Sequence, residues 1–273
     1  MKMVSLLLLL LLGLCNAQDG SDYGAESEIL MDQSDTEDIT TTILRMNNGS
    51  TEFMLEGDLI IPRTRNAMKC KRKPYNCRWP KSANGNVEVP YVLSSKYDQS
   101  EKRTILYAMK GIEDNTCIRY IPRARQTAYL DIVPRFGCAT TPGYIGDKQT
   151  LTLQKFGCID HGIIQHELLH TLGFYHEHMR SDRDQYVKIN FENIMKHFKF
   201  QFKKFDTDNL NTPYDYTSIM HYTRRALGKN NAVTITPIPD ASVTMGKSKR
   251  LSDIDIVRIN RLYQCAKKNS NRG

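Results

Sequence analysis

The stretch between residues 166 and 176 constrains this chain more than any other. It holds three histidines, His166, His170 and His176, together with Glu167 and Gly173. Residues four apart share one face of a helix, so His166 and His170 can point at one metal ion. Gly173 can end that helix in a left-handed conformation, after which the chain turns and returns His176 as a third ligand. A histidine pair alone is common by chance, but the complete pattern is a strong signal for zinc.

The same stretch predicts hydrolysis. Three neutral imidazoles leave a bound zinc ion with an open position for water, as in catalytic rather than structural sites. Zinc lowers the pKa of such a water towards about 7 and polarises a scissile carbonyl. Glu167 lies beside the ligand pair, where it can act as general base and pass the proton to the leaving amine. We therefore predict a zinc endopeptidase, with one ion per chain and no covalent intermediate.

The first 17 residues predict a secretory signal peptide. Lys2 is followed by a leucine-rich run and by Cys15-Asn16-Ala17, which fits a small-residue cleavage site. A membrane anchor is the alternative, but the apolar run is shorter than the roughly 20 residues that span a bilayer. We expect a soluble protein that is secreted to the extracellular space, including by way of secretory granules, and that binds neither membrane nor nucleic acid.

Charge divides the rest of the chain. Residues 18–65 contain 11 acidic and 3 basic residues, whereas residues 66–273 contain 34 basic and 19 acidic residues. This change of sign predicts an acidic propeptide (18–65) and a protease domain (66–273), separated by a trypsin-like protease after Arg65 to leave Asn66 as the new amino terminus. The basic part would suit an acidic substrate or a polyanionic matrix.

The acidic segment 18–65, called the leader here, has in parts, up to about residue 50, a composition typical of disordered chain. It contains one glycosylation acceptor triplet, at Asn48, which is common by chance.

Six cysteines remain once Cys15 leaves with the signal peptide. In a secreted chain they predict three disulfides, and counting alone leaves 15 connectivities open. They are Cys70, Cys77, Cys117, Cys138, Cys158 and Cys265.

Hydrophobic periodicity predicts an α+β fold with a cleft near Gly173. We expect strands at 87–92, 119–121, 129–133 and 150–153, and helices at 100–110, 162–172 and 252–263. Gly111 is predicted to stop the first of these helices. The chain after Gly173 is predicted to be mostly irregular until the last helix.

A second motif lies downstream, in Ser218-Ile219-Met220-His221-Tyr222. A zinc motif followed by such a Met-turn is the metzincin signature. With Glu177 directly after the third histidine and Tyr222 two residues after Met220, the chain resembles the astacin family of metzincins from residue 53 to residue 265. The resemblance implies two subdomains around a zinc cleft, with Met220 as the apolar floor beneath the ligands and His221 in a structural role.

The resemblance also implies several residue roles. Tyr222 would be an extra zinc ligand that swings aside to stabilise the oxyanion. Residues 53–58 would be the propeptide segment whose Asp58 takes the place of the zinc-bound water. Glu177 would hold the amino terminus of Asn66 after cleavage. The implied disulfides are Cys117–Cys265 and Cys138–Cys158, which leaves Cys70–Cys77.

The pair Cys70 and Cys77 is similar to that of fish hatching enzymes, which digest the egg envelope. The sequence continues for eight residues past Cys265, so we expect a protease without further modules, acting as a monomer on an extracellular glycoprotein matrix. A six-cysteine astacin of another tissue is the alternative, since residues 139–147 depart from the expected pattern at the cleft edge. A binding protein without catalytic activity is disfavoured, because the three histidines and Glu167 are all present. A structural protein that binds polyanions would be supported by charge alone.

Overall fold

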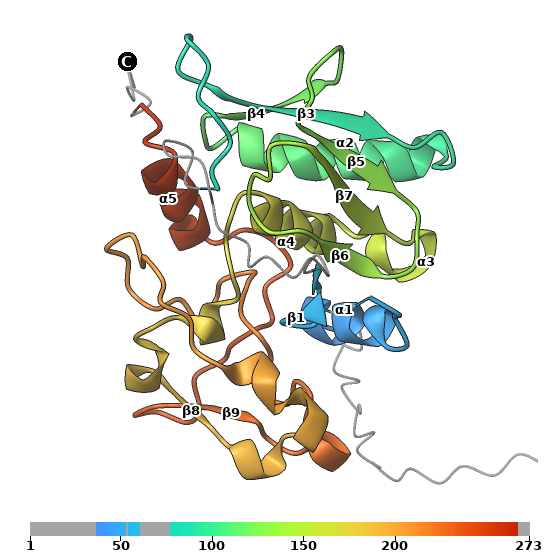
Figure 1. Cartoon of the computed structure of the whole chain (residues 1–273). Helices are drawn as coiled ribbons and strands as arrows, with labels where there is room; N and C mark the ends of the chain where they lie inside the picture. The colour runs from blue at the N-terminus through green and yellow to red at the C-terminus, as the bar shows by residue number, and fades with distance from the viewer. Residues whose placement is uncertain (1–36, 53, 61–76, 267–273) are drawn as a thin grey trace, which may run out of the picture. The chain divides into compact units, whose positions relative to one another are not determined.

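The computed structural model describes residues 37–52, 54–60 and 77–266. These residues belong to one compact unit that begins at Glu37. In Figure 1 a sheet with its helices occupies the upper part of this unit, and short irregular segments occupy the lower part. Helix α4 (His161–Thr171), which carries the histidine motif, lies beneath the sheet. The predicted α+β fold class is confirmed.

The main sheet has seven strands within the described residues, in the order β1-β2-β6-β7-β5-β3-β4. The strands are β1 (Met54–Leu55), β2 (Leu59–Ile60), β3 (Val87–Leu93), β4 (Ile118–Pro122), β5 (Tyr129–Val133), β6 (Cys138–Thr140) and β7 (Lys148–Leu153). Strands β7, β5, β3 and β4 run parallel, and β6 runs antiparallel to β7. The four predicted strands are these parallel ones, each correct within two residues. Strands β1, β2 and β6 were missed because two or three residues are too few to show a period.

Helix α2 (Gln99–Glu113) connects β3 to β4 and packs against α4. It begins with a capping box between Asp98 and Glu101. The prediction that this helix stops at Gly111 is wrong. A Cβ atom at position 111 would lie 2.5 Å from Nε2 of Gln165 on α4, so the missing side chain lets the two helices approach.

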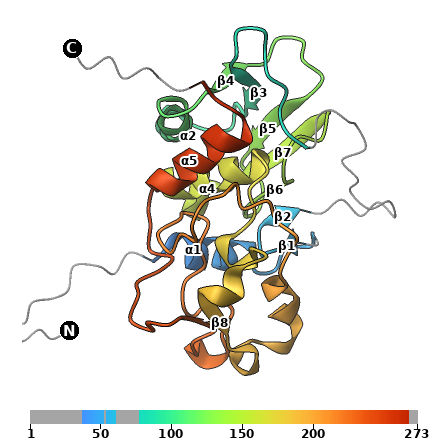
Figure 2. The same ribbon diagram turned by 90° about the vertical axis from the view of Figure 1, so that its left-hand side faces the viewer.

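Helix α4 is capped at its amino end by Asp160, whose side chain accepts hydrogen bonds from the N–H groups of Gly162 and Ile163. It ends as predicted, with Gly173 at a φ of +99°. Residues 162–171 are all buried, so the polar groups of this helix sit inside the protein. Figure 2 shows α5 (Asp253–Leu262) beside α4.

The lower part is built from 3-10 turns and a small two-stranded sheet. Strand β8 (Val187–Ile189) pairs antiparallel with β9 (Ile235–Pro237), and the 3-10 helix η4 spans Lys196–Phe202. This part has its own buried cluster, called the lower cluster here: Val187, Ile194, Phe202, Tyr214, Tyr222, Ala226, Ile235 and Met245. No helix among the described residues is both long and apolar enough to cross a membrane.

Helix α1 (Ile39–Asn47) is an ordered part of the leader, whose composition predicts poor order in parts up to about residue 50; residues 18–36 lie outside the described residues. Ile39 and Ile43, four residues apart, are buried in the same apolar cluster as the sheet, while Leu44 packs against the lower cluster. The helix thus contacts both parts (Figures 1 and 2). The composition of the leader is polar, but its few apolar residues fall on helical spacing.

Two disulfides brace the fold. Cys117–Cys265 ties the chain after α5 to the start of β4, and Cys138–Cys158 ties β6 to the short helix α3 (Lys155–Cys158). These are the two pairings that the resemblance implied. The third pairing involves Cys70, which lies outside the described residues.

We expect the two bridges to differ in their effect on stability. Replacing both Cys117 and Cys265 by alanine should lower the free energy of unfolding by about 5 kcal/mol, because the closed loop spans 148 residues. The same change at Cys138 and Cys158, 20 residues apart, should lower it by about 3 kcal/mol. Urea unfolding of the full chain measures both values, and a larger loss for the short loop would contradict the loop-entropy argument.

Candidate metal centre

Helix α4 and the turn after it place three histidines around one point. His166 and His170 lie one helical turn apart, and the reversal at Gly173 returns His176 to the same place. The three imidazoles are buried, and with Asp58 their ligand atoms lie within 4.8 Å of one another. The structure therefore brings together four residues that sequence analysis named from two separate motifs.

Hydrogen bonds on the far side of each ring fix its orientation. His166 Nδ1 lies 2.9 Å from the carbonyl oxygen of Ile219, and His170 Nδ1 lies 2.7 Å from that of Phe174. A carbonyl only accepts, so both Nδ1 atoms carry the ring proton and both Nε2 atoms keep a lone pair. His176 Nδ1 lies 2.6 Å from a buried carboxylate, so its Nε2 also faces the cluster.

The arrangement fits zinc. The Nε2 atoms of His166 and His176 are 3.1 Å apart, close to the roughly 3.3 Å expected for two nitrogen ligands of a tetrahedral zinc ion. Nε2 of His170 and Oδ1 of Asp58 are buried without a hydrogen-bond partner. Buried polar atoms normally have partners, and a shared cation would satisfy both. Burial lowers the pKa of His166 to about 4. Burial acts in the same direction on His176, but the carboxylates of Asp58 and Glu56 outweigh it and raise the pKa of His176 to about 9, so this ring has to release a proton to bind a metal ion.

Asp58 completes the cluster from the turn between β1 and β2. Its Oδ2 lies 3.1 Å from His166 Nε2 and 3.3 Å from His176 Nε2, and its Oδ1 lies 3.4 Å from His170 Nε2. Burial opposes ionisation, but the adjacent His176 and His170 hold the pKa of Asp58 well below its usual range. A carboxylate that stays ionised when buried requires a positive partner, which a divalent cation supplies.

Glu167 lies beside the cluster but outside the ligand set. It is fully buried, and neither carboxylate oxygen has a hydrogen-bond partner. Burial and then the charge of Asp58 raise its pKa well above the usual value. A raised pKa favours uptake of a proton, so the geometry suits a general base next to a metal site.

The Met-turn adjoins the cluster through Ile219, whose carbonyl oxygen lies 2.9 Å from Nδ1 of His166. Met220 is buried, and its carbonyl accepts a hydrogen bond of 2.9 Å from the N–H of Glu177. Asp255 on α5 accepts hydrogen bonds from the Ser218 hydroxyl and the Ile219 N–H, which ties the turn to that helix. The turn is thereby fixed from two directions.

Tyr222, two residues on, is buried with its ring 4.6 Å from that of His176. Its hydroxyl donates a hydrogen bond to the carbonyl oxygen of Glu56 in the leader. Burial, then the charges of Asp58 and Glu56, raise the pKa of this phenol well above its usual value, so it keeps its proton. The His221 ring bonds to the Tyr214 hydroxyl and to the Tyr222 carbonyl, which is a structural position.

Glu177, directly after His176, is buried. Arg258 contacts both of its oxygens, at 2.5 and 2.8 Å, and Arg180 lies 3.2 Å from one of them. The N–H of Asp215 adds a further hydrogen bond. The amino-terminal residue predicted to bind here, Asn66, lies outside the described residues, as does Arg65.

Sequence analysis missed three residues of this site: Glu56, Gln201 and Asn47. Glu56 accepts hydrogen bonds from both the backbone N–H and Nδ1 of His176. Gln201 binds the main chain around Glu56, and Asn47 links α1 to Gly57 and to β6. Glu56 lies within residues 53–58, which the resemblance marked for Asp58 alone, while Asn47 and Gln201 belong to no motif.

Comparison with known proteins places this geometry in a family. The model of the astacin family of peptidases matches residues 73–264. A low choriolytic enzyme of Oryzias latipes is 59% identical over 264 residues, which cover 96% of this chain and 97% of that protein. High choriolytic enzyme 1 of the same fish is 48% identical, with 86% of each chain covered. The structure of that second protein, described as a hatching enzyme zinc-protease, superimposes with a TM-score of 0.69 over 74% of this chain.

The Glu177 network generates a stability prediction. Arg258→Ala should lower the free energy of unfolding by about 3–5 kcal/mol, because it leaves a buried carboxylate with fewer partners. Arg261→Ala, on the same helix, is the control: Arg261 is exposed and donates only to the carbonyls of Leu210 and Asn211, so its loss should cost about 1 kcal/mol. Thermal and urea unfolding measure the difference, and similar losses for both variants would count against the buried pair.

Proposed function

This chain belongs to the astacin family of zinc endopeptidases, and we propose that it is a secreted protease made as a precursor and directed at an extracellular glycoprotein coat. The observation that carries the proposal is the buried cluster of His166, His170, His176 and Asp58 with Glu167 beside it. The coat as substrate is supported by 59% identity to a low choriolytic enzyme along almost the full length of both chains.

We assign the zinc ligands to His166, His170 and His176. When bound, the ion supplies Lewis acidity towards a peptide carbonyl and a water molecule. Glu167 takes the proton of the attacking water, since its two oxygens have no competing hydrogen bond, and hands it to the leaving nitrogen. Burial of the whole cluster strengthens these electrostatic effects.

Tyr222 is proposed to stabilise the oxyanion. Its hydroxyl keeps its proton and already donates to a peptide carbonyl oxygen, that of Glu56. Once the leader is gone, the same donor can turn to the substrate carbonyl, whose oxygen becomes negative during attack.

The leader is proposed to keep the precursor inactive. Asp58 fills the side of the cluster that water and substrate would need, and Glu56 holds His176 from behind. In this proposal residues 1–17 direct secretion, residues 18–65 are the propeptide, and residues 66–273 are the protease. A trypsin-like cut after Arg65 frees Asn66, whose amino group would enter the cavity of about 200 Å³ that borders Glu177.

The first test is digestion of a purified egg-envelope preparation by the trypsin-treated protein. We expect cleavage by the parent, and loss of at least about 1,000-fold in kcat for Glu167→Ala, because the general base is removed. A chelator control should also abolish cleavage. If the protein hydrolyses casein but leaves the envelope intact, the proposed protease activity stands and the proposed envelope substrate is refuted. A six-cysteine astacin of another tissue would then be favoured. Inactivity on both substrates, after confirmed removal of residues before Asn66, would refute the catalytic proposal.

The latency proposal has a separate test. Asp58→Ala in a precursor that also carries Arg65→Ala should show peptidase activity without cleavage, because no carboxylate blocks the cluster. Glu52→Ala in the same background is the control, since Glu52 is an exposed acidic residue of the leader. Peptide hydrolysis by the uncut proteins measures the effect. If the Asp58 variant hydrolyses no peptide although its mass is intact and it binds zinc, Asp58 does not maintain latency.

A further inference from the structure

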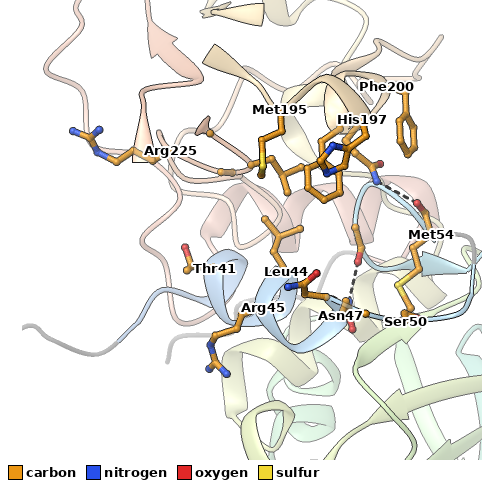
Figure 3. A pocket seen from close by; sticks show the side chains of 18 of the residues that line it. Thr41, Leu44, Arg45, Asn47, Ser50, Met54, Met195, His197, Phe200 and Arg225 are labelled. Carbon is orange, nitrogen blue, oxygen red and sulfur yellow. Dashed lines mark hydrogen bonds between the residues drawn. The ribbon is translucent and has the colours of Figure 1, made fainter. Parts of the chain in front are cut away.

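A buried glutamine of the lower part binds the main chain of the leader. The Gln201 side chain accepts a hydrogen bond from the N–H of Glu56, and its Nε2 donates one of 3.2 Å to the carbonyl oxygen of Met54. Gln201 is 3% exposed, so this amide has little access to water as an alternative partner. Figure 3 shows Met54 close to the segment that carries His197 and Phe200.

The spacing of these two bonds resembles strand pairing. The two bonded groups, an N–H and a carbonyl, belong to residues two apart in the sequence. In a parallel sheet, one residue likewise bonds to a carbonyl and to an N–H group that lie two residues apart on the neighbouring strand. The amide of Gln201 therefore takes the place of one strand residue and recognises main chain rather than any particular side chain.

The opposite wall of the cleft holds the leader in a similar way. Asn47 bonds to both the N–H and the carbonyl of Cys138 on β6, and the N–H of Thr140 donates to the carbonyl of Asp58. Leader groups thus satisfy polar atoms on both walls. Removal of the leader takes away both partners of Gln201, and water or a bound polypeptide then has to replace them.

Gln201 also faces space that a substrate could fill. It lines a cavity of about 750 Å³ between α1 and the lower part, together with apolar groups such as Leu44 and Phe198. Leu44 of α1 packs against the lower cluster, which includes Tyr222. Departure of α1 would open this apolar floor next to the histidine cluster.

We propose that Gln201 binds the main chain of the substrate in the activated enzyme. Its amide pairs with an N–H and a carbonyl two residues apart on a bound polypeptide, as it does with Glu56 and Met54. This inference rests on the proposed function as a peptidase. It makes Gln201 a binding residue for extended polypeptide of varied sequence.

The test couples a protein variant to a substrate change. Peptides in which one amide at a time is replaced by an ester lose one N–H donor at a known position. In the trypsin-activated parent, one ester position should lower kcat/KM about tenfold more than its neighbours. In Gln201→Leu, kcat/KM for the unmodified peptide should fall about tenfold, mainly through a higher KM. The ester at that one position should then lower kcat/KM no more than esters at neighbouring positions do.

Two further variants control for a purely structural effect. Gln185→Leu makes the same change at an exposed glutamine of the lower part and should leave the ester profile unchanged. Gln201→Glu retains the side-chain oxygen that accepts from an N–H group but loses the Nε2 donor. It should therefore still be most sensitive to the ester at that one position, while it binds peptides more weakly. It also provides a readout if the leucine variant fails to fold.

The precursor gives a readout that does not depend on activity. Hydrogen exchange of the Glu56 amide should be faster in Gln201→Leu than in the parent precursor, and unchanged exchange would overturn the pairing. An active parent with an identical ester profile in Gln201→Leu would overturn this inference and leave the protease proposal intact. An activated parent that cleaves no peptide would instead refute the proposed function, and the exchange experiment would then decide the pairing alone.

Discussion

The convergence of four polar side chains on one buried point is the constraint on which the rest of this structure depends. Three imidazoles and the carboxylate of Asp58 are almost completely withdrawn from water, which is unfavourable unless a cation joins them. The carbonyls of Ile219 and Phe174 orient two of the rings, so the helix, the turn after Gly173 and the Met-turn must all be in place for one site to exist. The fold thereby brings the continuous segment from α4 to His176 together with two distant ones, the Met-turn and the turn that carries Asp58.

The leader uses the groups that the proposed chemistry needs. It brings a carbonyl to the hydroxyl of Tyr222, a carboxylate to the histidine cluster and main-chain groups to Gln201. Each of these contacts imitates a part of a bound peptide or of the water that attacks it. In the proposed function, inhibition and substrate binding share one set of residues, on both walls of the cleft.

The two parts of the unit contribute differently. The upper part supplies a sheet, the buried helix α4 and the half-exposed helix α2, and the close approach of the two helices depends on Gly111. The lower part has little regular secondary structure but contains a buried aromatic cluster with Tyr222 in it. Helix α1 contacts both, because Ile39 and Ile43 face one part and Leu44 the other.

The sequence by itself determined the metal chemistry, since the spacing of His166, His170 and His176 around Gly173 is a local property of one helix and one turn. It also predicted the parallel strands, whose apolar runs are long enough to show a pattern. The tertiary structure alone decided what meets that helix from elsewhere: the pairing of Glu56 with His176, of Gln201 with the leader, and of Arg258 with Glu177. These contacts join residues far apart in the chain, often from irregular segments. No local periodicity encodes them, because they arise only when the core has brought the segments together.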